Sequence, residues 1–356
     1  MDASRSAPIG VLTFHRCINY GSYWQARCLV EGLIARGHNA VLLDYQSSRI
    51  DRAEWRVALR PAQGFWGERE DRKLYAEKTR KFFAAFETLP LSRSFPLDEP
   101  ERAGSFDLVV VGSDEVFNLR HPWFGGETLF YGEGLRAKRR ASYAASFGNQ
   151  SYELDHPWVE RLRNFDDVAV RDANSAGIVS KALGLEPVMV LDPVLQFPEI
   201  IEPAPVHERP PYIALYGHGM PDWFAQKVRA FADRIGRQIV SIGYRNWWAD
   251  ESWIDAGPAE FAGFIARADA VVTNFFHGCV FAMVNNKPFG TAPSDYRSNK
   301  VRDLVNALDA QLHLVTEANA DADYDRLLGT PLNPMIGARI ATLRQSSESY
   351  LDGILA

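Results

Sequence analysis

Cysteine is scarce in this sequence, and its three cysteines lie far apart. Cys17, Cys28 and Cys279 form neither a zinc-binding spacing nor a disulfide framework, and their number is odd. This pattern excludes a disulfide-stapled secreted scaffold and is natural in a reducing cytosol. We therefore expect a cytoplasmic protein, and we expect it to hold no metal.

Long apolar runs and an excess of positive charge are also missing. No apolar stretch approaches the ~20 residues that a bilayer-spanning helix needs, and Met1 to Pro8 lack the apolar core of a signal peptide. The formal net charge is −6, so a nucleic-acid duplex would repel the chain unless basic residues clustered. We expect neither a membrane-spanning protein nor a nucleic-acid partner.

The sequence does contain enough apolar material for two domains. Its 356 residues exceed what one core usually holds, and 46% hydrophobic with 24% charged residues is typical of a soluble globular protein. The segment from Phe197 to Pro211 holds five prolines and is the best candidate for a linker between the domains.

Short apolar runs of strand type alternate with helical patterns along the chain, which predicts an α/β fold with parallel sheets. The basic run Arg136 to Arg140 is expected as an exposed turn before one of these strands. The predicted strands are Ile9–Phe14, Ala40–Asp44, Phe106–Val111, Ala141–Ala145, Val168–Val170, Val188–Leu191, Tyr212–Tyr216, Gln238–Gly243 and Ala270–Thr273.

The region from Gln46 to Leu91 interrupts the alternation. Within it, Arg69 to Phe86 has a helical pattern, and ten Lys or Arg residues face six Asp or Glu residues between Arg49 and Lys81. Two interpretations stay open. The helix is either a solvated cover for a sheet edge or a basic surface that contacts an anionic bilayer or a lipid-diphosphate acceptor.

Polar residues follow several predicted strands, at the sheet edge where ligands collect in parallel α/β folds. Asn19 and Gln25 either bind substrate there or cap and brace a turn. Arg171 either grips a phosphate or carboxylate with two hydrogen bonds or pairs with a nearby acid such as Asp172.

The stretch around His277 carries the clearest chemical signal. The strand Ala270–Thr273 stops at Asn274, His277 and Gly278 follow, and a helix is expected from Cys279 to Asn286. A histidine beside a helix N-terminus, which favours anions, suits acid/base chemistry on a phosphate- or carboxylate-bearing substrate. The alternative is a histidine packed under a loop.

Five short motifs occur in an order that is similar to that of a known family. They are Thr273-Asn274-Phe275-Phe276-His277-Gly278, Asn19-Tyr20-Gly21 with Gln25, Val111 to Asn118, Ser142 to Gly148, and Val170-Arg171-Asp172 followed by Asp192-Pro193. The first resembles the Ser-Phe-His-Gly signature of the polysaccharide pyruvyltransferase family. The resemblance runs from about Ile9 to about Leu308.

This resemblance implies two Rossmann-like α/β domains that face each other across a cleft, as in the GT-B arrangement. The N-terminal domain would span residues 1–197 with a helical insertion at 46–91, and the C-terminal domain would span residues 212–333. Residues 334–356 would form a C-terminal helix that packs back on the N-terminal domain.

The resemblance also implies an enzyme that transfers the pyruvyl group of phosphoenolpyruvate to a sugar of a polysaccharide or its lipid-linked precursor, forming a pyruvate ketal. It implies no cofactor. The cytoplasmic location expected from the cysteines would place the protein at the inner face of the membrane if the basic helical region makes peripheral contact with a bilayer. His277 and Arg171 are the expected catalytic residues. The expected substrate-binding residues are Asn19, Tyr20, Gly21, Gln25, Ser113, Asp114, Asn118, Ser146, Phe147, Gly148, Asn274, Phe276, Gly278, Arg297 and Lys300.

The sequence departs from the family pattern beside this expected site. Phe275 replaces a serine, Asn274 an acid, Glu115 a glutamine and Trp24 a leucine. Two alternatives therefore stay open, namely a GT-B glycosyltransferase that uses a nucleotide sugar and a non-catalytic member of a polysaccharide assembly complex.

Overall fold

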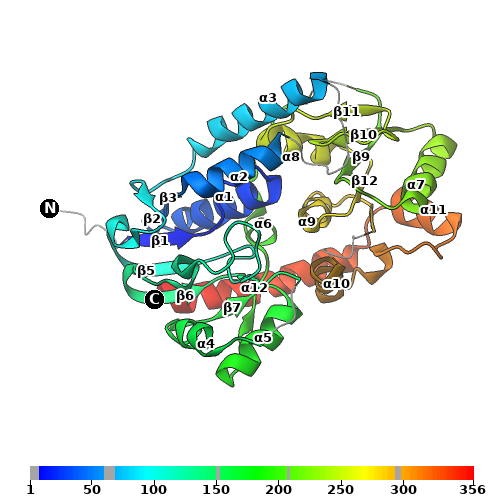
Figure 1. Cartoon of the computed structure of the whole chain (residues 1–356). Coiled ribbons are helices and arrows are strands. Elements are labelled where there is room, and N and C mark those ends of the chain that lie inside the picture. Colours follow the sequence, from blue (N-terminus) through cyan, green and yellow to red (C-terminus); the bar gives the residue numbers. More distant parts are fainter. Residues whose placement is uncertain (1–7, 60–68, 150–152, 207–208, 293–297) are drawn as a thin grey trace. The chain divides into compact units, whose positions relative to one another are not determined.

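The computed structural model describes residues 8–59, 69–149, 153–206, 209–292 and 298–356, and the chain forms two compact units (Figure 1). The first unit comprises Met1–Glu54, Phe86–Ile200 and Thr342–Ala356. The second comprises Trp55–Ala85 and Ile201–Ala341. Each unit is built around its own parallel β-sheet.

The sheet of the first unit has the order β2-β1-β5-β6, and every neighbouring pair is parallel. β1 is buried along its whole length because all four of its residues are apolar or small. The strands of this unit are β1 (Ile9–Leu12), β2 (Ala40–Leu42), β3 (Tyr45–Gln46), β4 (Phe95–Pro96), β5 (Ser105–Val111), β6 (Arg136–Ser142), β7 (Ala169–Val170) and β8 (Val188–Met189). The helices that begin in it are α1 (Tyr20–Ala35), α2 (Ser48–Ala58), α4 (His156–Arg163), α5 (Ala173–Leu183) and α6 (Pro193–Gln196).

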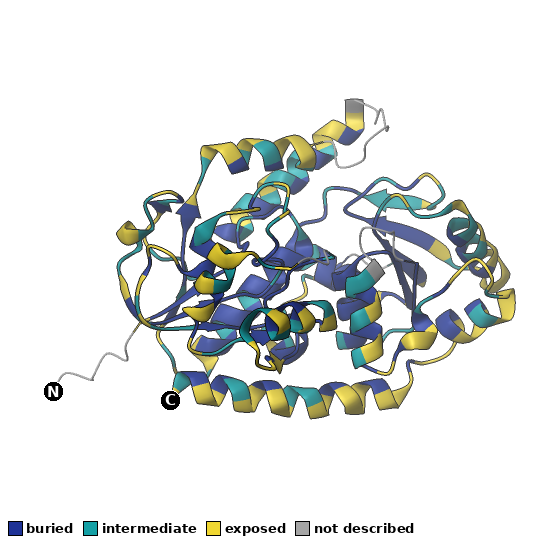
Figure 2. Cartoon of the chain, turned by 60° about the horizontal axis from the view of Figure 1, so that its bottom comes forward, coloured by how far each residue is buried: buried dark blue, intermediate teal, exposed yellow. Residues whose placement is uncertain are grey.

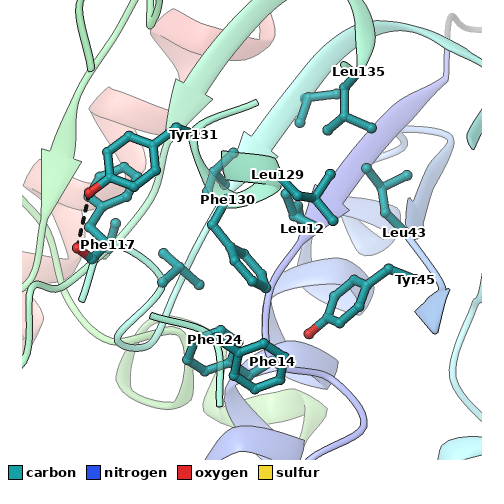
Figure 3. Close-up of a cluster of buried hydrophobic side chains, with 14 of the residues drawn as sticks. Leu12, Phe14, Leu43, Tyr45, Phe117, Phe124, Leu129, Phe130, Tyr131 and Leu135 are labelled. Atoms are coloured by element: carbon teal, nitrogen blue, oxygen red, sulfur yellow. Dashed lines mark hydrogen bonds between the residues drawn. The ribbon is translucent and has the colours of Figure 1, made fainter. Parts of the chain in front are cut away.

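An aromatic core fills the first unit on one side of this sheet (Figure 3). The Phe14 and Phe124 rings stack with centroids 4.3 Å apart, and the Phe130 ring meets Phe14 edge-on at 5.0 Å. The Tyr131 hydroxyl donates to the carbonyl of Phe117 at 3.0 Å, which keeps a buried polar group satisfied. The long connection after β5 is thereby fixed to the sheet.

The sheet of the second unit has the order β11-β10-β9-β12-β13 and is also parallel throughout. Its first strand in the chain, β9, lies in the middle, so the connections diverge from β9 in two directions. The strands are β9 (Tyr212–Tyr216), β10 (Gln238–Ile242), β11 (Glu251–Trp253), β12 (Ala270–Thr273) and β13 (Phe289–Thr291). The helices are α3 (Arg69–Phe86), α7 (Asp222–Ile235), α8 (Pro258–Arg267), α9 (Phe276–Val284), α10 (Ser298–Ala307), α11 (Asp321–Gly329) and α12 (Pro334–Leu355), whose last residues belong to the first unit.

Two segments of the chain belong to a different unit from the residues that adjoin them in the sequence. Most of α3 belongs to the second unit, where the Lys81 ammonium lies 2.8 Å from a carboxylate oxygen of Glu260. The sequence had attached this helix to the N-terminal domain, because its amphipathic pattern does not show which sheet it meets. The end of α12 belongs to the first unit, where the Ser347 hydroxyl accepts from the backbone N–H of Leu191 at 2.8 Å.

Burial follows the sheets in both units, whose strands are mostly dark blue in Figure 2, whereas many helices show exposed faces.

The basic run expected as a turn is instead the first part of β6, which pairs with β5 from Ser105↔Arg136 onward. In the part of the chain that the structure describes, no helix combines the length and the apolar content that a membrane span requires.

Candidate functional site

Each sheet has one point where its connections diverge, and ligands of open α/β folds bind at the carboxyl edge of such a point. In the first unit this point lies between β1 and β5, and in the second it lies between β9 and β12. The residues that follow these four strands include most of the residues predicted to bind substrate. We describe the two edges as the first-unit edge and the second-unit edge.

Arg171 lies at the first-unit edge and holds two carboxylates. Its Nη1 is 2.8 Å from Asp192 Oδ2 and its Nη2 is 3.1 Å from Asp114 Oδ1. The side chains of Arg171 and Asp192 are 2% and 1% exposed, whereas that of Asp114 is 14% exposed. Burial opposes the charge of Arg171, but the surrounding carboxylates, first Asp114 and Asp192, outweigh it and raise the pKa of the guanidinium. Asp172, which the sequence suggested as a partner of Arg171, instead caps α5 by accepting from the N–H of Ser175.

Asp114 is the most exposed member of this group and is oriented from three sides. Besides Arg171, the Ser22 hydroxyl donates to its Oδ2 at 2.8 Å, and the backbone N–H of Glu115 donates to its Oδ1 at 2.9 Å. Its backbone has φ of 76°, a conformation that costs a non-glycine residue free energy. A carboxylate fixed in this way can accept a hydrogen bond or a proton from a hydroxyl.

Asn19 and Gln25 make the structural contacts that the sequence left as an alternative, and Ser113, predicted to bind substrate, contacts Gln25. Asn19 caps α1 by accepting from the N–H groups of Gly21 at 2.8 Å and Ser22 at 3.2 Å. The Gln25 amide donates to Thr13 Oγ1 and accepts from Ser113 Oγ, both at 2.9 Å. These bonds connect the end of β1 to the loop after β5 and so hold the backbone of the first-unit edge in place.

The other predicted residues of the first unit are packed around the same loops. Asn118 donates to Glu115 Oε2 at 2.7 Å. At Gly148, with φ of 69°, a Cβ would lie 2.3 Å from that carboxylate oxygen, so only glycine fits there. Ser146 accepts from the N–H of Gly148 at 2.9 Å. The remaining three residues, Tyr20, Gly21 and Phe147, are buried.

His277 lies in the first turn of α9, at the second-unit edge. The helix begins at Phe276, earlier than the sequence predicted, so His277 is part of the helix rather than of a turn before it. A Cβ at Gly278 would lie 2.0 Å from Thr273 Oγ1, so a glycine is needed for the helix to begin this close to the end of β12. His277 is therefore held where the N-terminal end of a helix favours an anion.

Asn274 connects the two loops of the second-unit edge. Its Nδ2 donates to the carbonyl of His218 at 2.8 Å. Its Oδ1 is buried with no hydrogen-bond partner among the described residues, and a Cβ at Gly217 would lie 2.1 Å from it. Gly217 has φ of 144°, so both space and backbone geometry require glycine beside Asn274.

A cluster of aromatic rings packs at this edge beside His277. The Phe275 ring meets those of Tyr216, His218 and Tyr244 at centroid distances of 5.0, 5.4 and 5.7 Å. The Phe276 ring lies 5.1 Å from the His277 imidazole. The departure at Phe275 thus replaces a small hydroxyl side chain with a buried ring that packs against three other rings.

Three further residues, His218, Tyr244 and Lys78, lie together beside the second-unit edge and were not among the predicted site residues. Lys78 is 4% exposed and lies on α3 with its ammonium 4.3 Å from the centroid of the Tyr244 ring. Burial lowers its pKa to about 7. A signal was present, because a lysine between Leu74 and Phe82 at four-residue spacing falls on the apolar stripe of the helix.

Of the two basic residues predicted after β13, Lys300 lies in α10 and is partly buried, and Arg297 lies outside the described residues. Across the described ranges, no three His, Cys, Asp or Glu side chains are grouped as metal ligands. Cys279 follows Gly278 but is fully buried, and burial raises the pKa of its thiol to about 12, which suits packing rather than nucleophilic attack.

A family model described as polysaccharide pyruvyl transferase matches residues 19–292. That match includes all the described site residues discussed above except Lys300. A comparison with curated proteins gives no match.

Solved structures share the fold at low identity. The UDP-GlcNAc 2-epimerase of Methanocaldococcus jannaschii, solved with UDP-GlcNAc and UDP, is 12% identical, with 95% of this chain and 99% of that chain covered and a TM-score of 0.50. MnaA of S. aureus, solved with UDP, is 13% identical, with 97% and 96% covered and a TM-score of 0.50. This likeness concerns the fold alone, and with the two parallel sheets it confirms the predicted α/β, GT-B-like fold class.

Proposed function

This chain belongs to the polysaccharide pyruvyl transferase family, and from that membership we propose that it transfers the pyruvyl group of phosphoenolpyruvate to a sugar. The acceptor is a sugar residue of a polysaccharide or of its lipid-linked precursor, and the products are a cyclic pyruvate ketal and phosphate. The observation that carries the proposal is the position of His277 in the first turn of α9, at the divergence point between β9 and β12.

We assign the donor to the second-unit edge on grounds of charge. Phosphoenolpyruvate carries a phosphate and a carboxylate, so its site needs hydrogen-bond donors and positive charge. The N-terminal end of α9 and the imidazoles of His218 and His277 would supply hydrogen-bond donors, and the ammonium of Lys300 would supply positive charge.

We assign the acceptor sugar to the first-unit edge. Arg171 is matched there by Asp114 and Asp192, so this edge offers carboxylate oxygens rather than unmatched positive charge. Of the two roles open to Arg171, gripping a donor anion or holding the acidic pair, these contacts support the second. Arg171 would then fix the orientation of Asp114, whose carboxylate can accept a hydrogen bond from a sugar hydroxyl.

The proposed reaction balances without a cofactor or an oxidant. One acceptor hydroxyl oxygen bonds to C2 of the enolpyruvyl group, the C3 methylene becomes a methyl group by accepting a proton from His277, and the proton of that hydroxyl restores the protonated imidazole. The second hydroxyl then bonds to C2, the C2–O bond to phosphate breaks, and the phosphate leaves with that hydroxyl's proton. Acid/base catalysis of such steps usually contributes about 10²–10⁴-fold.

The test is transfer by the His277→Ala variant and by the unchanged chain, with phosphoenolpyruvate and lipid-linked oligosaccharides as substrates. Phosphate release and the new ketal methyl signal in the NMR spectrum are measured together. We expect a loss of at least about 100-fold in His277→Ala with the thermal unfolding midpoint unchanged. Transfer above about a hundredth of the normal rate would show that His277 has another role.

The ligand that stabilises the unchanged chain separates this proposal from the two alternatives. Phosphoenolpyruvate should raise the thermal unfolding midpoint, because a ligand that binds only the folded state stabilises it. A rise with nucleotide sugars instead would indicate a glycosyltransferase. Binding without phosphate release, across a panel of acceptors, would indicate a non-catalytic member of an assembly complex.

We also propose that the reaction takes place in the cytoplasm, with peripheral contact at the inner face of the membrane where lipid-linked acceptors lie. In support, Cys17, Cys28 and Cys279 are all buried and none is in a disulfide. Fractionation of cells that make the acceptor would test this location. Recovery outside the cytoplasmic membrane would contradict it.

A further inference from the structure

Helix α3 carries three polar residues on its buried face. Asp71, Tyr75 and Lys78 are spaced four and three residues apart, which places them on one side of the helix. They are 2%, 7% and 4% exposed. Burying an ammonium or a carboxylate is costly unless each finds a partner, so contacts specific to this face must hold them.

All three residues contact the loop that follows β10. The Lys78 ammonium donates to the carbonyl of Gly243 at 3.0 Å and lies over the Tyr244 ring at 4.3 Å, a cation–π distance. The hydroxyl of Tyr75 accepts from the backbone N–H of Arg245 at 3.1 Å. Asp71 accepts from the Arg245 guanidinium, with Nε at 3.2 Å. Helix α3 thus holds the three consecutive residues 243–245.

The other side of the same loop contacts both loops of the second-unit edge. The Tyr244 ring lies 5.0 Å from the imidazole of His218 and 5.7 Å from Phe275. Asn246 donates to the carbonyl of Gly217 at 2.9 Å. The contacts therefore run without a break from α3, through residues 243–246, to the residues beside His277.

We propose that Lys78 is a positioning residue of the second-unit edge, which fixes residues 243–246 and through them the His218 imidazole and the Phe275 ring. The site that it serves rests on the proposed function, although the contacts do not. Burial lowers the pKa of the lysine to about 7, as expected for an ammonium held away from water. Its side chain is long enough to reach from α3 to the Gly243 carbonyl, and its charge strengthens the hydrogen bond made there.

Lys81 provides a matched control on the same helix. Its ammonium also makes contacts within the second unit, 2.8 Å from Glu260 and 3.3 Å from Asp255. It is partly exposed, and it does not contact residues 243–246 in any of the contacts described. Replacing Lys81 therefore removes a lysine from α3 and leaves the loop contacts in place.

The experiment compares Lys78→Met, Lys81→Met and the unchanged chain by hydrogen exchange of peptides that cover residues 217–219 and 243–246. We expect exchange at least about 10-fold faster in Lys78→Met alone, since a charge-assisted hydrogen bond to the loop is lost. In the transfer assay we expect KM for phosphoenolpyruvate to rise about 10-fold while kcat changes little, because the loss is one of ground-state positioning.

Three outcomes are decisive. Faster exchange in Lys78→Met and not in Lys81→Met supports the proposal. Equal exchange in all three proteins overturns it, whether or not transfer is observed. If the unchanged chain transfers no pyruvyl group, the proposed function fails and the exchange comparison alone decides the role of Lys78. Should Lys78→Met not fold, Lys78→Gln, which keeps a shorter donor, is measured in its place against the same criteria.

Discussion

The side-chain amide of Asn274 donates to the backbone carbonyl of His218 at 2.8 Å, and this hydrogen bond joins the loops after β12 and β9. Asn274 directly precedes the Phe275 and Phe276 rings that flank His277. The arrangement of these two loops at the second-unit edge therefore depends on an amide donor at residue 274. An acid, which the family resemblance places there, would accept hydrogen bonds instead.

Replacing Asn274 by Asp should separate these two loops. The carboxylate cannot donate to His218 and would place a negative charge beside a carbonyl oxygen, so we expect about 10-fold weaker binding of phosphoenolpyruvate. Calorimetric titration measures the change. Asn285→Asp is the control, because Asn285 donates to the carbonyl of Phe281 at 2.8 Å away from this edge. Equal affinity in both variants would contradict the prediction.

Gly278→Ala should destabilise the second unit. The added methyl group would meet Thr273 Oγ1 at 2.0 Å, and such overpacking typically costs about 1–3 kcal/mol. Urea unfolding measures the difference. Gly337→Ala, at an exposed position of α12 where nothing lies within 4 Å, should stabilise the helix by about 0.5–1 kcal/mol. If Gly278→Ala proved as stable as Gly337→Ala, α9 would not need its close approach to β12.

Arg171→Met should be among the most destabilising single changes in the first unit. It leaves Asp114 and the fully buried Asp192 without their cation, and breaking a buried pair in this way costs about 3–5 kcal/mol. Adding Asp192→Asn should restore part of the loss. In contrast, Arg139→Met breaks the pair with Asp167, whose side chains are 41% and 40% exposed, and should cost about 1 kcal/mol or less. Similar losses in the two single variants would show that Arg171 is not a structural cation.

Glu54 should make stability fall as the pH rises. Burial raises the pKa of its carboxyl to about 8, although the backbone N–H of Ile18 opposes the rise. Between the ordinary pKa of about 4.3 and this value, the folded state binds more protons than the unfolded state. The free energy of unfolding should therefore decrease from about pH 4.5 to pH 8 relative to Glu54→Gln, measured by urea unfolding at several pH values. Parallel curves for the two proteins would refute the raised pKa.

The sequence was most informative where apolar runs end sharply. β9 and β12 have the predicted bounds, Tyr212–Tyr216 and Ala270–Thr273, because each run stops at a glycine or an asparagine. The start of α9 was placed too late. Its N-cap is Phe275, which makes no side-chain cap hydrogen bond, so the sequence carries no capping signal there. The fit of Gly278 against Thr273 allows the early start, and that is a tertiary contact.

The basic run at β6 shows a second limit of sequence patterns. Lys138 lies 2.9 Å from Asp107 and Arg139 lies 3.3 Å from Asp167, so partners distant in the chain accompany these charges within the sheet. A local window shows only the charges and predicts a turn. The same limit hid Lys78, whose place on an apolar stripe was visible but whose contact with Gly243 was not.

Neither unit of this protein is formed by one continuous segment of the chain. The backbone passes between the units at Glu54–Trp55, Ala85–Phe86, Ile200–Ile201 and Ala341–Thr342. Neither half of the molecule is thus encoded by one uninterrupted stretch of its gene. A ribosome that has finished the last strand of the first sheet still lacks the closing residues 342–356, so that half completes its packing only after the other has been synthesised.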